Sequence, residues 1–105
     1  MILVTSDEVP GRRVTRVLGL VQGSTVRARH LGQDITAFLK NITGGEIREY
    51  TKLLAEAREQ CLDRMREDAA RQGANAVVCV RFSSTDISEG ASELLVYGTA
   101  VVIEG

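Results

Sequence analysis

EIREYTKLLAEAREQCLDRMREDAARQ, residues 46–72, is the stretch of sequence that decides the fold. Its apolar residues recur every three or four positions: Ile47, Tyr50, Leu54, Ala57, Cys61, Met65 and Ala69. This period predicts an amphipathic helix over Glu46–Gln72 with one apolar stripe and one charged face. Gly73 supplies the left-handed residue that ends such a helix. At a rise of 1.5 Å per residue, the helix is about 40 Å long, so it needs an extended surface to pack against.

Three β-prone runs surround this helix and predict a sheet. They cover Arg12–Arg29, Asn75–Ser84 and Glu93–Glu104, and a short fourth run covers Ile2–Thr5. The first run alternates two faces but contains two glycines, which predict a bend, a bulge or a close backbone approach. We expect it to be strongly curved or broken near Gly23–Ser24.

The segments between these runs are predicted to be a short helix and a loop. Asp34–Asn41 has apolar residues at helical spacing and is followed by Thr43-Gly44-Gly45, which indicates a helix end. Thr85–Ser92 is polar and contains a glycine, which is typical of a loop between two strands.

The order strand, helix, strand, strand predicts a two-layer α+β fold of β-α-β-β type. The first two long strands, joined through the helix, run parallel to each other, and the third returns antiparallel between them. The result is a three-stranded mixed sheet of order 1-3-2 with the long helix across one face.

One helix covers only one face of this sheet, and apolar residues remain for the other face. We expect Val77, Leu95, Val101 and Ile103, or their neighbours in the alternation, to lie there. Uncovered, they form a larger apolar surface than a soluble monomer normally exposes. The sequence therefore predicts a homo-oligomer, with Ile2–Thr5 added as a strand to the edge of a neighbour's sheet.

Length, composition and charge restrict the class of protein. The chain has 105 residues with 44% hydrophobic and 26% charged residues, which is typical of one folded domain, residues 1–105. A net charge of −1 gives no general attraction to nucleic acid or to an anionic membrane. The first residues lack the basic segment of a signal peptide, and no apolar run reaches the ~20 residues of a membrane span. We expect a cytoplasmic protein with reduced cysteines.

The residues that could hold a metal ion are few. Zinc in a structural site takes about four Cys, His or carboxylate ligands, whereas the chain offers Cys61, Cys79 and His30 without ligand spacing. Cys61 lies on the apolar stripe and Cys79 in an apolar strand, where a thiol usually serves as a small hydrophobic side chain. A soft or borderline metal ion remains an alternative if both thiols project into the helix–sheet layer, or if several subunits contribute ligands.

A second candidate site is a set of anion ligands. Arg27 and Arg29 point to the same side of an extended segment, close in sequence to Ser24 and Thr25, and guanidinium groups with hydroxyls suit phosphate or carboxylate. Ion pairing with a neighbouring subunit is the favoured interpretation of these arginines and of Arg81. No pair of acid and base or of nucleophile and base is evident, so we expect no enzymatic activity.

Seven segments together resemble one known family. They are Val9-Pro10-Gly11, Leu18-Gly19-Leu20-Val21, Gly23-Ser24-Thr25-Val26-Arg27, Gly44-Gly45-Glu46, Gly73-Ala74-Asn75-Ala76-Val77, Val80-Arg81-Phe82 and Tyr97-Gly98-Thr99-Ala100-Val101. The chain resembles, from Met1 to Glu104, the YbjQ-like family of small bacterial and archaeal proteins, which carry the label "putative heavy-metal-binding". The resemblance implies a subunit like that of dodecin, assembled into a ring that is usually a pentamer, with stacked rings as a further possibility. The family pattern usually has Ala and Gly where this chain has Cys61 and Cys79, so the two thiols belong to no shared metal motif.

Three functions follow as hypotheses from these observations. The first is a non-enzymatic ring that binds a small ligand or a partner or acts as a scaffold. The second is a heavy-metal-binding protein, as the family label implies. The third is an enzyme whose site lies between subunits, where residues distant in sequence converge.

Overall fold

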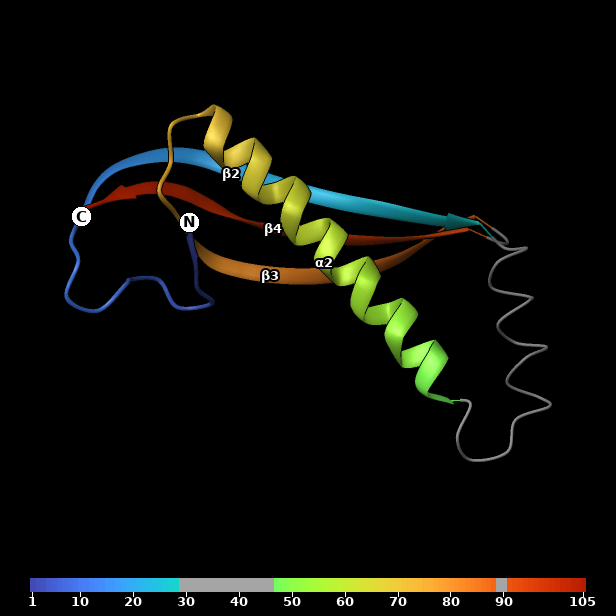
Figure 1. The fold of residues 1–105 in the computed structure, drawn as a ribbon. Helices are drawn as coiled ribbons and strands as arrows, with labels where there is room; N and C mark the ends of the chain where they lie inside the picture. The colour runs from blue at the N-terminus through green and yellow to red at the C-terminus, as the bar shows by residue number, and fades with distance from the viewer. Residues whose placement is uncertain (29–46, 89–90) are drawn as a thin grey trace.

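The computed structural model describes residues 1–28, 47–88 and 91–105. In these ranges one helix, α2 (Ile47–Arg71), lies across one sheet (Figure 1). The strands are β1 (Ile2–Leu3), β2 (Val14–Ala28), β3 (Ala76–Ser88) and β4 (Ala91–Ile103). The predicted α+β class is confirmed, whereas the short helix predicted at Asp34–Asn41 lies outside the described residues.

The sheet differs in detail from the prediction, because it has four strands in the order β1-β3-β4-β2. Its three long strands stand in the predicted arrangement: β4 lies between β2 and β3 and pairs antiparallel with both. The fourth strand is β1, which pairs parallel with the start of β3, Ile2 opposite Ala76 and Leu3 opposite Val77. The prediction that this segment joins a neighbour's sheet is therefore wrong for this structure, since β3 of the same chain offers an open edge to it.

The hairpin between β3 and β4 is longer than predicted. The prediction of a loop over Thr85–Ser92 is wrong for most of that segment, because pairing continues from Thr85 opposite Glu93 to Ser88 opposite Ala91. Serine and threonine are tolerated in an exposed strand, and the cross-strand ladder outweighs the local polarity that suggested a loop.

The two glycines of β2 mark a bulge and a close contact with the helix, as predicted, but the predicted break in the strand is wrong. Pairing with β4 is continuous from Gly19 to Ala28, so the strand is not broken at Gly23–Ser24. Register shifts fall instead between Val14 and Arg16 and between Val17 and Gly19, and Gly19 has a φ of 124°. A bulge of this kind suits glycine, because other residues rarely adopt that backbone conformation.

The main core lies between α2 and the sheet. The predicted helix bounds are confirmed to within one residue at each end, and Gly73 ends the helix with a φ of 88°. Along the apolar stripe, Cys61, Met65 and Ala69 are fully buried. They pack against strand residues that all face the helix: Val21, Val77, Val80, Val96 and Ala100.

A second apolar cluster occupies the opposite face of the sheet. It consists of Ala76, Val78, Val101 and Ile103, and the chain before β2 covers it through Ile2, Val4 and Val9. Val101 and Ile103 lie on the face away from the helix, as expected, but they are buried and not uncovered. Val77, expected on the same face, faces the helix. The uncovered part of this face carries Leu20, Val26 and Tyr97, with 68%, 58% and 38% of each residue exposed.

The helix crosses the sheet diagonally, so its two halves have different surroundings. It packs mainly on β2 and less on β4, and its N-terminal half projects past the β3 side of the sheet (Figure 1). Leu53 and Leu54 in that half are exposed, as is Phe82 on β3. The apolar stripe is thus longer than the sheet beneath it. No helix in the described ranges has the length and apolar character needed to cross a bilayer.

Candidate functional site

Cys61 is the more buried of the two cysteines predicted as metal ligands. It has no exposed surface, and its thiol donates to the carbonyl oxygen of Leu94 at 3.3 Å. The hydroxyl of Thr25, which is 3% exposed, lies 3.6 Å from the same sulfur atom. A sulfur atom with these neighbours fills the core and contacts one buried and one partly buried polar group, which is the structural role favoured from the sequence.

Cys79 lies at an irregularity in β3. The register of β3 against β4 shifts between Val78 and Arg81, and Cys79 has a φ of 56°, in the left-handed region. Its amide donates to the carbonyl oxygen of Ser6 at 2.9 Å, which ties the N-terminal segment to the bulge. A residue with a Cβ atom is unfavourable in this conformation, whereas glycine adopts it freely.

The two cysteines lie on opposite faces of the sheet. Cys61 belongs to the cluster beneath α2, and Cys79 packs against the cluster beneath the N-terminal segment. The possibility that both thiols project into the helix–sheet layer is therefore wrong. The bulge is the reason that simple alternation along β3 does not predict the position of Cys79.

A metal centre is not assembled within the described part of one chain. There, no three His, Cys, Asp or Glu side chains come close enough together to hold an ion. His30, the remaining sequence-predicted ligand, lies outside the described residues.

The predicted anion-binding residues are divided between the two faces of β2. The side chain of Thr25 is buried beneath α2, and the neighbouring residue Ser24 lies on the alternate face. These two hydroxyls therefore do not converge on one ligand. Of the arginines, Arg29 and the side chain of Arg27 lie outside the described part of the structure.

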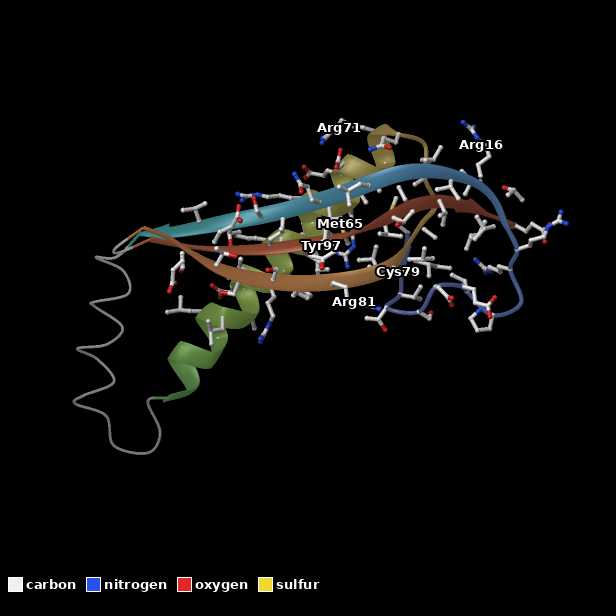
Figure 2. The ribbon with its side chains drawn as sticks, turned by 180° about the vertical axis from the view of Figure 1, so that it is seen from behind. Arg16, Met65, Arg71, Cys79, Arg81 and Tyr97 are labelled. Carbon is white, nitrogen blue, oxygen red and sulfur yellow. The ribbon has the colours of Figure 1, made fainter. Side chains whose placement is uncertain are left out.

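Arg81 binds the protein's own backbone. Its guanidinium Nη1 donates to the carbonyl oxygen of Thr5 at 2.7 Å and to that of Val80 at 2.8 Å. It lies opposite Tyr97 in the pairing of β3 with β4, on the side of the sheet away from α2 (Figure 2). Arg81 thus helps to hold the N-terminal segment in place, and its side chain remains exposed.

Two helix residues that sequence analysis did not single out cover the outer edge of β2. Asp68 accepts a hydrogen bond from the amide of Gln22 at 3.3 Å, and Arg64 donates to the carbonyl oxygen of Ser24. Edge strands carry unpaired backbone groups, and these side chains satisfy two of them. Arg64 and Asp68 are four residues apart, so the sequence places them on one side of the helix, but it does not show that this side borders a strand edge.

Asn75 is a further residue that the sequence did not indicate. Its side-chain Nδ2 donates to the carbonyl oxygen of Ile103 at 2.9 Å, and its side-chain Oδ1 accepts from the backbone amide of Ile103 at 2.7 Å. Asn75 therefore extends the ladder between β3 and β4 by one pair of bonds made through a side chain.

The comparisons with known proteins agree along nearly the whole chain. A UPF0145 protein from Hahella chejuensis is 54% identical over 104 residues, which are 99% of this chain and all of the relative. One from Dehalococcoides mccartyi strain BAV1 is 51% identical with the same coverage, and one from Halobacterium salinarum is 52% identical over 98% of this chain and 99% of its own.

Structure and family models extend this likeness. One similar solved structure is the crystal structure of a protein of unknown function from Pediococcus pentosaceus, assigned to the DUF74 family. Its TM-score is 0.62, and the match covers 99% of this chain and 98% of that one. The two sequences are 10% identical, so the likeness supports the fold alone. The model of the YbjQ family, described as "Putative heavy-metal-binding", matches residues 1–104. The chain therefore belongs to the YbjQ family.

Proposed function

We propose that this protein is a non-enzymatic binding or scaffold module that works as a homo-oligomeric ring in the cytoplasm. The supporting observation is apolar surface left open on both sides of the molecule. On the face away from α2 it consists of Leu20, Val26 and Tyr97, and on the helix it consists of Leu53 and Leu54. Monomeric proteins rarely expose more than about 300–600 Å² of contiguous apolar surface.

The positions of these surfaces favour a ring. They lie on different elements of one molecule, so a contact that joins one to the other is heterologous, and a heterologous contact gives a ring when the rotation between copies closes and a filament when it does not. A pentamer is the size implied by the family resemblance. A net charge of −1 supports self-association over binding to nucleic acid or to an anionic membrane.

Sedimentation velocity of the untagged protein tests this proposal. Five copies of the 11.4 kDa chain give a particle of about 57 kDa. The double variant Leu20→Ser with Val26→Ser should shift the population towards smaller species, and Gln22→Ser, on the same face of the same strand, is the matched control. A wild-type particle of one chain across the micromolar range contradicts the proposal.

Heavy-metal binding is the second candidate function, and the family description favours it. Because the described part of one chain brings no three ligands together, a site needs ligands from several copies or from residues outside the described ranges, such as His30. Cys79 is the more accessible thiol, since it is half-buried and Cys61 is fully buried. Elemental analysis and titration with zinc, copper and nickel test this candidate. Binding that persists unchanged in Cys79→Ala, Cys61→Ala and His30→Ala excludes these residues as ligands.

An enzyme with its site between subunits is the third candidate. Native mass spectrometry of the assembled protein separates metal binding from the other two, because a bound metal ion and a bound organic molecule differ in mass. Chemical conversion of a bound organic molecule on incubation then distinguishes an enzyme from a binding module.

A further inference from the structure

Residues 2–9, which we call the strap, cross one end of the sheet. The strap runs from the edge of β3 towards the start of β2, on the other side of the sheet (Figure 1). It ends at a β-turn over residues 9–12, where Gly11 has a φ of 80°, as a type II turn requires. Beyond the turn, the amide of Glu104 donates to the carbonyl oxygen of Arg13 at 3.0 Å and fixes the start of β2. The strap is thus a distinct piece of chain, attached to β2 through a turn.

The bulge in β3 binds the strap through its backbone. The amide of Cys79 donates to the carbonyl oxygen of Ser6 at 2.9 Å, and the amide of Val80 donates to that of Val4 at 3.0 Å. Successive amides of a regular strand point to opposite sides, so both amides reach the strap only because of the bulge and the left-handed conformation of Cys79. Such a conformation persists in a residue with a Cβ atom only where its surroundings hold it. The position of the strap and the conformation of Cys79 are therefore coupled.

Arg81 adds a bond from its side chain. Its Nη1 donates at 2.7 Å to the carbonyl oxygen of Thr5, which lies between the two carbonyl groups that the bulge binds. Hydrogen bonds from a charged donor are stronger than bonds between neutral groups. Arg81 lies beside Cys79 on the face of the sheet away from α2, and its side chain is exposed (Figure 2). Its guanidinium group therefore fastens the strap from the outside.

The apolar contacts of the strap are few. Ile2, Val4 and Val9 pack against the cluster on the face away from α2, and all three are half-buried. Residues 5–8 between them are exposed, whereas Val21 and other residues beneath α2 are fully buried. Segments with few buried apolar contacts and exposed backbone open at a lower free energy than the core does.

The strap covers part of a larger apolar face. The cluster beneath it consists of Ala76, Val78, Val101 and Ile103. Leu20 and Val78 both lie opposite Thr99, so the covered cluster continues into the exposed surface around Leu20 and Tyr97. Opening of the strap therefore enlarges one continuous apolar surface.

We propose that the strap opens as one unit while the main core stays folded, and that Arg81 is its latch. In the closed state the strap covers the cluster and holds Cys79 in the left-handed conformation. In the open state the cluster is uncovered, the Cys79 thiol is accessible and its backbone is released. The strap thus regulates how much of the apolar face is available for contact. The inference concerns the conformation of one chain, so it stands whether or not the protein assembles.

Amide hydrogen exchange followed by NMR tests the strap in the full-length wild-type protein. The amides of Val4, Cys79 and Val80 all bond between the strap and β3, so a single opening step should give them protection factors that agree within about 10-fold. They should also be at least about 10-fold less protected than the amides of Val96 and Gly98 in the central strand β4. A wider scatter among the three amides, or a smaller separation from the two amides of β4, overturns the inference.

Arg81→Met tests the latch, because it keeps an unbranched side chain and removes the bond to Thr5. We expect the protection of the three strap amides to fall by about 10-fold, and the rate at which Ellman's reagent modifies Cys79 to rise by about the same factor. The protection of Val96 and Gly98 should not change. Arg16→Met, at an exposed arginine of β2 outside the strap, is the matched control and should change neither quantity.

The two readouts separate opening of the strap from general destabilisation. A fall in protection that is equal for the strap and for β4 means that Arg81 supports the whole fold, and it overturns the assignment of Arg81 as a latch. Wild-type exchange and wild-type thiol reactivity in a folded Arg81→Met protein overturn it as well. The exchange experiment on the wild type requires no variant, so it decides on the strap even if circular dichroism shows that Arg81→Met is unfolded.

Discussion

Replacing Gly23 with alanine tests how closely α2 lies on β2. A Cβ atom at this position overlaps the carbonyl oxygen of Cys61 and lies 2.7 Å from the amide nitrogen of Met65. Both are backbone atoms of the helix, so no side-chain rotation relieves the contact. The helix must move away by about 1 Å. A gap of that size removes about a quarter to a half of the attractive energy of each dispersion contact between the helix and the sheet.

The expected loss of stability is large for one methyl group. Overpacking of a core costs about 1–3 kcal/mol when side chains adjust, and here a rigid helix must move instead. We therefore expect Gly23→Ala to lower the free energy of unfolding by about 3 kcal/mol. For a slope of about 1–3 kcal/mol/M in urea, the midpoint falls by about 1–3 M.

Urea denaturation followed by circular dichroism, at one fixed protein concentration, measures this change. Gly98→Ala is the matched control in the same sheet. Its Cβ atom lies 2.7 Å from a side-chain carbon of Val77 and 3.0 Å from the carbonyl oxygen of Val78, so it overlaps backbone atoms less than a Cβ atom at position 23 does. We expect about half the loss for the control. A loss below about 1 kcal/mol for Gly23→Ala, or one no larger than for Gly98→Ala, refutes the argument.

Three further predictions concern single side chains. Asn75→Ala removes both bonds to Ile103 and leaves that backbone without its partner, so it should lower the free energy of unfolding by about 1–3 kcal/mol, measured by the same denaturation; an unchanged midpoint contradicts this role. Cys79→Val should be less stable than Cys79→Gly by about 1–2 kcal/mol, because a β-branched residue is strained at a φ of 56°; equal stabilities argue against the strained conformation. Ellman's reagent should modify the half-buried Cys79 in the native protein and Cys61 only after unfolding; single-cysteine variants assign the two rates, and equally fast native reaction of Cys61 is incompatible with its burial.

The spacing of apolar residues along the chain predicted much of the fold. The spacing of apolar residues over 46–72 predicted the helix and its buried stripe, and the order of elements predicted that β4 lies between β2 and β3. The stripe predicted correctly that Cys61 is buried. The helix could be predicted because its pattern depends on residues within one or two helical turns of each other. The strand order could be predicted because it depends on how the chain connects the elements.

The candidate site was predicted less well, because it depends on register. Period-two alternation did not foresee the bulge that places Cys79 beneath the N-terminal segment, on the opposite face from Cys61. It also did not foresee that the segment before β2 covers Val101 and Ile103. These outcomes depend on contacts between residues far apart in the chain.

The amino-acid sequence by itself determined the α+β class, the long helix and the arrangement of the three long strands, because hydrophobic period and connectivity are properties of the chain. The tertiary structure alone decided which edge each outer segment occupies: β1 on its own β3, and Arg64 and Asp68 on the edge of β2. The physical reason is that a backbone hydrogen bond can be satisfied by any donor or acceptor within reach, and only the packed arrangement of helix and sheet determines which group is within reach.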